Sequence, residues 1–326
     1  MAYTDIDKPS DYFNTVLYTG NGSGQTISGV GFQPDWNWTK CRTATQSHVL
    51  TDSVRGVTKT LFTNATQAET TLTNGLTSFN SDGYAFGDSA LWTDNTKTFA
   101  SWNWKKTADA GFDIVSYTGN GSNRTISHNL GAVPKMMIVK ERDNANDWKV
   151  YHHSIGNGKS LRLDTSAAQG DDSTAWNSTT PTSSVFSVGT SNAVNRNGGD
   201  IIAYCFADTG NKFFKAGSYT GNGNVSGSYI HLGFKAAWLL VKSTAANDWI
   251  LHDTKRNPHN VSNVILHPNA SDADVTNTIY NLDILSNGFK TRTTHARLNG
   301  SGVTYIYMAF AENPFVTSTG VPACAR

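Results

Sequence analysis

Short apolar segments alternate with Gly-, Asn- and Ser-rich stretches along the whole chain, and their periodicity favours strands. Residues 36–38 and 102–104 both read WNW, in which aromatic and polar positions alternate with the period of a half-buried strand. Residues 136–139 (MMIV) and 238–241 (WLLV) are continuously apolar, which is typical of strands that are covered on both faces. The pattern therefore predicts many short strands and no long helix.

A repeated pentapeptide organises these segments. YTGNG begins at residues 18, 117 and 219, so the copies are 99 and 102 residues apart. Each copy is followed by an apolar segment that ends in lysine, at Lys40, Lys140 and Lys242. Glycine allows a positive φ and asparagine tolerates one, so we interpret each YTGNG as the turn of a β-hairpin.

The repeat predicts three units of similar length. We expect an all-β fold of three tandem β-sandwich, jelly-roll-like repeats of about 100 residues, which is the size of an independent sandwich. The predicted boundaries are an N-terminal arm at 1–12, repeats at 13–108, 109–210 and 211–312, and a C-terminal arm at 313–326.

Composition and charge exclude several classes of function. Charged residues make up 16% of the chain and the net charge is +1, so no broad basic field is available for nucleic acid or an anionic membrane. No apolar run approaches the length of a membrane-spanning helix, and residues 1–13 show no signal-peptide pattern. Three widely spaced cysteines (Cys41, Cys205 and Cys324) indicate folding in a reducing cytoplasm without a disulfide framework.

Motifs of catalysis are missing from the sequence. The chain contains no GxSxG or HExxH motif and no complete phosphate-binding GxxxxGKS/T motif, so we expect no enzyme activity and no cofactor. Asp171–Asp172 and the Asp272/Asp274 pair fall in corresponding loops and could supply oxygen ligands to calcium. The alternative interpretation, in which these carboxylates cap turns, is the commoner role of aspartate.

Two repeat-equivalent tryptophans are the best candidates for binding. Trp148 and Trp249 each follow an Asn-Asp pair, which comprises Asn146 and Asp147 in one copy and Asn247 and Asp248 in the other. An exposed indole can cover the apolar face of a sugar while amides and carboxylates bind its hydroxyls. The alternative is that both rings pack in the sandwich core.

The predicted terminal arms resemble assembly devices. The C-terminal arm carries Pro314, Phe315, Val316 and Val321 and shows no strand pattern. Burial of these side chains against a neighbouring subunit would stabilise an oligomer, whereas the rival interpretation is a mobile tail.

Several longer motifs resemble one protein family. KPSDYF (8–13), GFQPDW (31–36), DSVRG (52–56), SFNSDGY (78–84) and the ending MAFAENPFVTSTGVPACAR (308–326) are similar to an uncharacterised repeat family with YTGNG repeats. That family occurs in virion structural and tail-fibre-like proteins of tailed, mainly marine, bacteriophages. The resemblance implies a virion protein made in the host cytoplasm, and it brings no catalytic residues.

The expected function is therefore a virion structural protein of the tail or tail fibre. The expected partners are other virion proteins, further copies of the chain in a homo-oligomer (a trimer favoured), and a host-surface glycan; nucleic acid and membrane insertion are not expected. One alternative is a capsid decoration or head-fibre protein. Another is a glycan-binding or glycan-degrading tailspike-type enzyme, which would need two carboxylates about 5–9.5 Å apart.

Overall fold

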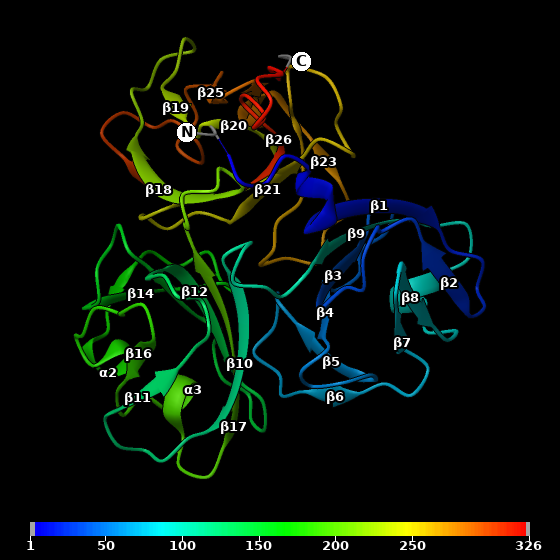
Figure 1. The fold of residues 1–326 in the computed structure, drawn as a ribbon, viewed down its shortest axis with the longest axis vertical. Coiled ribbons are helices and arrows are strands. Elements are labelled where there is room, and N and C mark those ends of the chain that lie inside the picture. Colours follow the sequence, from blue (N-terminus) through cyan, green and yellow to red (C-terminus); the bar gives the residue numbers. More distant parts are fainter. Residues whose placement is uncertain (1–3, 324–326) are drawn as a thin grey trace.

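Three large antiparallel sheets, one from each third of the chain, surround a common centre (Figure 1). The structure is a computed structural model that describes residues 4–323. The predicted all-β class is confirmed, because the helices in this range are single turns. We call residues 13–108, 109–210 and 211–314 the first, second and third unit.

The first unit pairs a six-stranded sheet with a smaller sheet. The large sheet has the order β1-β9-β3-β4-β5-β6 and the small one the order β2-β8-β7. The bounds are β1 (Phe13–Thr19), β2 (Gln25–Ser28), β3 (Trp36–Cys41), β4 (Val49–Asp52), β5 (Lys59–Phe62), β6 (Thr70–Thr71), β7 (Leu76–Asn80), β8 (Gly83–Phe86) and β9 (Thr98–Trp104). The 3-10 turn η1 (Pro9–Asp11) precedes β1, and the one-turn helix α1 (Ala90–Thr93) precedes β9.

The second unit has the same order in its large sheet, β10-β17-β12-β13-β14-β15, together with a small β11-β16 sheet. The bounds are β10 (Phe112–Thr118), β11 (Arg124–Ser127), β12 (Pro134–Glu141), β13 (Lys149–His152), β14 (Lys159–Arg162), β15 (Gly170–Asp171), β16 (Val185–Val188) and β17 (Asp200–Ala207). Helix α2 (Ser173–Trp176) lies beside β16 of the small sheet, whereas helix α3 (Asn192–Asn195) contacts β12 of the large sheet and α2.

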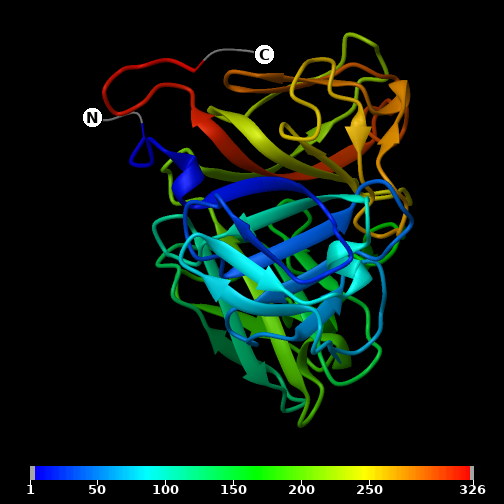
Figure 2. The same ribbon diagram turned by 90° about the vertical axis from the view of Figure 1, so that its right-hand side faces the viewer.

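The large sheet of the third unit has four strands in the order β18-β26-β20-β21, which corresponds to the first four strands of the large sheets in the other two units. Two smaller sheets have the orders β19-β25-β24 and β22-β23. The bounds are β18 (Phe214–Thr220), β19 (Tyr229–His231), β20 (Phe234–Ser243), β21 (Ile250–Asp253), β22 (Val264–Ile265), β23 (Val275–Thr276), η2 (Thr278–Tyr280), β24 (Leu282–Leu285), β25 (Gly288–Thr291) and β26 (Thr304–Pro314). Both described ends of the chain lie beside this unit (Figures 1 and 2).

Aromatic side chains from all three units meet in one hydrophobic core. The ring of Trp36 lies 4.9 Å from that of Tyr204 in the second unit. Trp104 lies 5.5 Å from Trp238 in the third unit, and Phe206 lies 5.9 Å from Phe310. Burial of each large apolar side chain contributes about 1.5–3 kcal/mol. The three units share this core, so their description as three separate domains stays a prediction.

The continuously apolar strands are buried on both faces, as predicted. In β12, Met136 and Ile138 join the shared core, whereas Met137 and Val139 join a second cluster beneath the small sheet of their own unit. In β20, residues 238–241 are at most 1% exposed.

The prediction of half-buried WNW strands is wrong. Trp36, Asn37 and Trp38 are all fully buried, because the small sheet covers the face that carries Asn37. The amide of Asn37 is satisfied there, since its Nδ2 donates to Asn103 Oδ1 at 2.7 Å. An alternating strand is therefore compatible with two covered faces when the polar residues bind one another.

The hairpin interpretation of YTGNG is also wrong. β1 pairs with β9 and β2 pairs with β8, so the motif carries the chain from the large sheet to the small one. A Cβ at Gly20 would lie 2.3 Å from the carbonyl oxygen of Asp94, and at Gly119 it would lie 2.2 Å from that of Arg196. The first glycine of each motif is thus required by a close backbone approach rather than by a hairpin turn.

The tyrosine of each YTGNG fixes this crossing. The hydroxyl of Tyr18 donates to the carbonyl oxygen of Trp92 at 2.9 Å. The equivalent bonds join Tyr117 to Val194 at 2.7 Å and Tyr219 to Leu298 at 2.8 Å. Each crossing is therefore tied to the segment just before the strand that pairs with β1, β10 or β18.

Candidate functional site

The two candidate tryptophans lie at joints between units rather than on the surface. Trp148 is 0% and Trp249 is 1% exposed. Trp148 Nε1 donates to the carbonyl oxygen of Phe62 in the first unit at 2.9 Å, and Trp249 Nε1 donates to that of Arg162 in the second unit at 2.7 Å. Neither ring can stack on a sugar, so the predicted sugar contact is wrong and the core alternative holds.

The polar residues next to these tryptophans are half-buried and hold their own loops. Each binds another side chain of the protein: Asn146 binds Glu141 at 2.8 Å, Asp147 binds Arg162 at 2.9 Å, Asn247 binds Ser243 at 3.1 Å, and Asp248 binds Arg297 at 3.1 Å. These contacts stabilise the turns that place the tryptophans, and they do not form a surface for a ligand.

A buried charge network joins the first unit to the second. Arg55 lies 2.5 Å from Asp52 and 3.0 Å from Glu69, and both Asp52 and Arg55 have fully buried side chains. From the second unit, Arg142 binds Glu69 at 2.9 Å, and the hydroxyl of Tyr204 donates to Asp52 at 2.7 Å. Burial opposes the charge of Arg55, but the neighbouring carboxylates outweigh it and raise the pKa of Arg55.

An equivalent network joins the third unit to the first. Arg256 pairs with Asp253 and lies 2.9 Å from Asp274. From the first unit, Arg42 binds Asp274 at 2.8 Å, and Trp102 Nε1 donates to Asp253 at 3.1 Å. Both networks contain an Asp-x-x-Arg sequence, at residues 52–55 and 253–256. This repeated spacing could have indicated the two joints, but the predictions from sequence did not include it.

Among the described residues, the Asp, Glu and Arg network of the other two joints does not recur between the second and third units. The backbone contact is the same at each joint: Glu69 N–H donates to Arg142 O, Asp274 N–H to Arg42 O, and Gln169 N–H to Thr244 O. At the last of these, Gln169 and Thr244 stand where the other joints have a carboxylate and an arginine. His152 takes the place of Asp52 in the register, because it pairs with Met136 as Asp52 pairs with Trp36.

His152 is neutral in this joint. Its Nδ1 accepts from the backbone N–H of Ser154, so the proton lies on Nε2, which donates to the carbonyl oxygen of Tyr307 in the third unit at 3.2 Å. Burial, assisted by His153, lowers the pKa of His152 to about 3. The third joint therefore depends on an uncharged imidazole.

The lysine of each repeat is fully buried and binds carbonyl oxygens. Lys140 Nζ donates to Thr66 O in the first unit at 3.0 Å and to Asn146 O at 2.8 Å. Lys242 Nζ donates to the carbonyl oxygens of Ser243 and Ala245, both at 2.8 Å. Burial lowers the pKa of Lys40, Lys140 and Lys242 to about 8. These amines cap loops that follow the strands.

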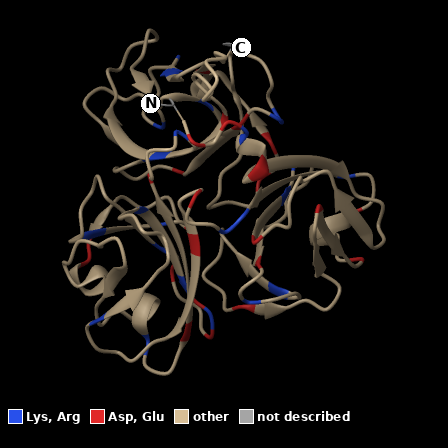
Figure 3. Cartoon of the chain, in the orientation of Figure 1, with Lys and Arg blue, Asp and Glu red and all other residues tan. Residues whose placement is uncertain are grey.

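Of the four aspartates considered for calcium, Asp171, Asp172 and Asp274 bind basic side chains, whereas Asp272 forms no ion pair with the described residues. Asp172 lies 2.7 Å from Lys149, Asp171 lies 3.3 Å from Lys159, and Asp274 belongs to the network described above. Within residues 4–323 no group of three or more His, Cys, Asp or Glu side chains could hold a metal ion. Acidic and basic residues are interspersed along a mostly uncharged ribbon (Figure 3).

The C-terminal segment differs from the predicted extended arm. Pro314 is buried at the end of β26, where it pairs with Phe234, so the strand reaches beyond the predicted boundary. The chain then turns back: Val316 bridges to Pro322, and Ala323 N–H donates to Phe315 O at 2.9 Å. Val321, at the tip, is 60% exposed. Residues 1–3 and 324–326 of the predicted arms lie outside the described range.

The N-terminal segment packs against the third unit. Ile6 is 5% exposed, and the hydroxyl of Thr4 donates to the carbonyl oxygen of Asn211. Asp7 accepts from the backbone N–H of Ser318 at 2.6 Å, so the two terminal segments contact each other. The described part of the predicted N-terminal arm is therefore bound within the same chain.

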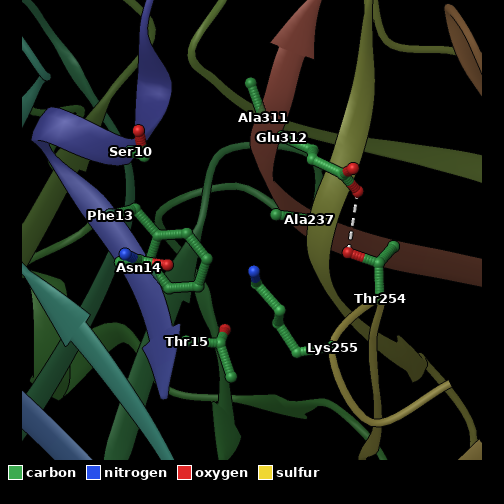
Figure 4. A pocket seen from close by; sticks show the side chains of 9 residues that line it. All are labelled: Ser10, Phe13, Asn14, Thr15, Ala237, Thr254, Lys255, Ala311 and Glu312. Carbon is green, nitrogen blue, oxygen red and sulfur yellow. Dashed lines mark hydrogen bonds between the residues drawn. The ribbon is translucent and has the colours of Figure 1, made fainter. Parts of the chain in front are cut away.

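A small cavity of about 90 Å³ lies where β1 meets the third unit (Figure 4). Phe13 and Ala237 form apolar walls, and the exposed Lys255 extends toward them. Thr254 donates to Glu312 at 2.8 Å on the opposite side. The cavity can hold only a few water molecules, so we interpret it as a packing defect at the joint.

Among the described residues, no helix is long and apolar enough to cross a membrane. No curated protein matches the chain. A family model described as a domain of unknown function (DUF7483) matches residues 8–314. Since this match includes all three units, the protein belongs to the family of the domain of unknown function DUF7483.

Proposed function

We propose that the protein is a non-enzymatic structural component of a bacteriophage particle, in the tail or a tail fibre. The observation that carries the proposal is the position of the DSVRG motif, one of the segments that resemble phage virion proteins. Its Asp52 and Arg55 lie in the buried network between the first and second units. These residues, which carry part of the resemblance, thus join the first unit to the second through a buried network, which suits a load-bearing role.

Localisation on particles tests this proposal. Antibodies against the purified chain, coupled to gold, are applied to particles of a phage that encodes it, with antibody pre-adsorbed on the chain as the control. Label along the tail or its fibres supports the proposal. Label over the capsid supports the decoration alternative, and purified particles without label contradict a virion role.

We also propose that the chain forms a homotrimer through its C-terminal segment, and this proposal can be tested separately. Val321 is 60% exposed at the tip of that segment, and Val225 is 59% exposed on the third unit. Light scattering should give three times the 35.3 kDa chain mass. Val321→Asp should dissociate the trimer, whereas the matched Val225→Asp should not. A monomeric wild-type chain would contradict the proposed trimer.

A further inference from the structure

A polar pocket of about 390 Å³ lies on the second unit, between β13, β14 and β15 and the start of α2. Neither tryptophan lines it, and Arg162, whose carbonyl oxygen accepts from Trp249 Nε1, is the residue that the pocket shares with that joint. Its charged and hydroxyl-bearing lining residues are Lys149, Ser160, Arg162, Asp171, Asp172, Thr174 and Ser191.

Two of these residues replace an apolar pair of the first unit. Asp172 occupies the position of Leu72, because Asp172 N–H donates to Gly158 O as Leu72 N–H donates to Thr58 O, both at 2.8 Å. Lys149 occupies the position of Val49, since it pairs with Val139 as Val49 pairs with Thr39. Val49 belongs to the apolar core of the first unit, and the partly buried Leu72 packs against that core.

Stability does not require this replacement. Lys149 is 8% exposed, and its Nζ lies 2.7 Å from Asp172. A buried ion pair generally stabilises a protein no more than a well-packed apolar pair of similar volume. The sequence therefore retains a charged pair beside a cavity, at a place where the same fold accepts Val and Leu.

Asp172 fixes the directions of the neighbouring polar groups. It accepts from Lys149 Nζ at 2.7 Å, from Ser160 Oγ at 2.7 Å and from Thr174 Oγ1 at 3.0 Å. Since both hydroxyls give their proton to Asp172, their oxygen atoms can only accept from a ligand. Lys149 keeps two further N–H groups as donors. The pocket thus holds donors and acceptors side by side.

The charges of the pocket cancel locally. Lys149 is paired with Asp172, Arg162 with Asp147 at 2.9 Å, and Asp171 with Lys159 at 3.3 Å. An anion entering the pocket would face Asp172, and a cation would face Lys149. A sugar hydroxyl can accept from Lys149 while it donates to Ser160 or Thr174, so adjacent hydroxyls of one sugar match the alternation of groups.

We infer that this pocket binds a neutral saccharide. The inference assigns a ligand class to the second unit and does not depend on the structural role proposed above. It is tested on the isolated chain, so it can fail while localisation on the particle succeeds, and the reverse also holds.

Saturation-transfer NMR on the full chain tests the inference with glucose, galactose, mannose and N-acetylglucosamine as probes. Glucuronic acid and glucosamine serve as the anionic and cationic comparisons. We expect transfer to at least one neutral sugar and weaker transfer to both charged ones. Absence of transfer to every neutral sugar, or stronger transfer to a charged one, would overturn the inference.

Variants then locate the site. The double variant Lys149→Val with Asp172→Leu copies the first unit, so it should fold, and it should weaken binding at least about tenfold through loss of charge-assisted hydrogen bonds. Thr174→Val removes one acceptor, leaves the ion pair, and should also weaken binding. Lys59→Ala alters the equivalent strand of the first unit and should leave binding unchanged. Unchanged binding in both pocket variants would overturn the inference.

Discussion

The hydroxyl of Tyr204 donates a hydrogen bond of 2.7 Å to the buried carboxylate of Asp52 in the preceding unit. The ring of Tyr204 also lies 4.9 Å from that of Trp36 in the shared core. One residue of the second unit therefore binds the first unit through both a polar and an apolar contact. Because Asp52 is also paired with Arg55, this bond links the core to the charge network at the joint.

The polar part of this contact can be measured by Tyr204→Phe. The variant keeps the ring and removes one hydrogen bond to a charged group, so we expect the free energy of unfolding to fall by about 1.5–3 kcal/mol. Urea denaturation followed by tryptophan fluorescence gives the value. Tyr151→Phe is the matched control, because the hydroxyl of this buried tyrosine has no hydrogen-bond partner among the described residues. Equal losses in both variants would show that the bond contributes nothing specific.

The fold class could be predicted from the sequence because strand periodicity is local. The apolar runs at 136–139 and 238–241 report burial on both faces directly, and the structure confirms it. Strand pairing is not local: nothing beside residues 18–22 reveals that β1 pairs with β9 rather than with β2. The YTGNG segments were therefore recognised as equivalent but given the wrong kind of turn.

The candidate site could not be found from sequence for a related reason. An Asn-Asp-Trp segment has the same composition whether its ring faces solvent or a neighbouring unit. The hydrogen bond of Trp148 Nε1 goes to the backbone carbonyl oxygen of Phe62. Because every residue has such a carbonyl, the identity of residue 62 gives no indication of this contact. The charge networks, in contrast, repeat the Asp-x-x-Arg spacing at 52–55 and 253–256, so a comparison of the units could have revealed them.

Acid should weaken the joint between the second and third units through His152. Burial lowers the pKa of His152 to about 3, below its value of about 6.5 in an unfolded chain. The unfolded chain thus binds a proton first, so the stabilising effect is complete above pH 6.5 and is lost as the pH falls toward 3. His152→Gln keeps an N–H donor without titrating and should flatten this slope by up to about 1.4 kcal/mol per pH unit.

The measurement is the free energy of unfolding between pH 7 and pH 4.5. The exposed His259 provides the control, and His259→Gln should leave the wild-type slope intact. An unchanged slope in His152→Gln would show that other groups, rather than this joint, set the acid response.

The three repeat lysines should resist amine acylation in the native protein. Their lowered pKa, about 8, would make them more reactive than ordinary lysines if reagent could reach them, because a larger fraction is the neutral amine. All three are 0% exposed, so burial should dominate. Brief treatment with an N-hydroxysuccinimide ester, followed by peptide mass spectrometry, should label the exposed Lys255 and leave Lys40, Lys140 and Lys242 unlabelled. Labelling of the three before Lys255 would contradict the buried carbonyl contacts.

Gly20 should be intolerant of any side chain, because the chain crosses between sheets at this point. A Cβ there would lie 2.3 Å from the carbonyl oxygen of Asp94, which is backbone and cannot rotate away. We therefore expect Gly20→Ala to lower the free energy of unfolding by about 2–3 kcal/mol. A Cβ added at Gly158 would meet no atom within 4 Å and its φ is not positive, so Gly158→Ala should be neutral or stabilise by up to about 1 kcal/mol. Thermal and urea unfolding of the two variants gives the comparison. If Gly20→Ala and Gly158→Ala both unfold like the wild type, the close approach to Asp94 does not require glycine at the first position of YTGNG. The backbone geometry at this crossing between sheets would then differ from the one described.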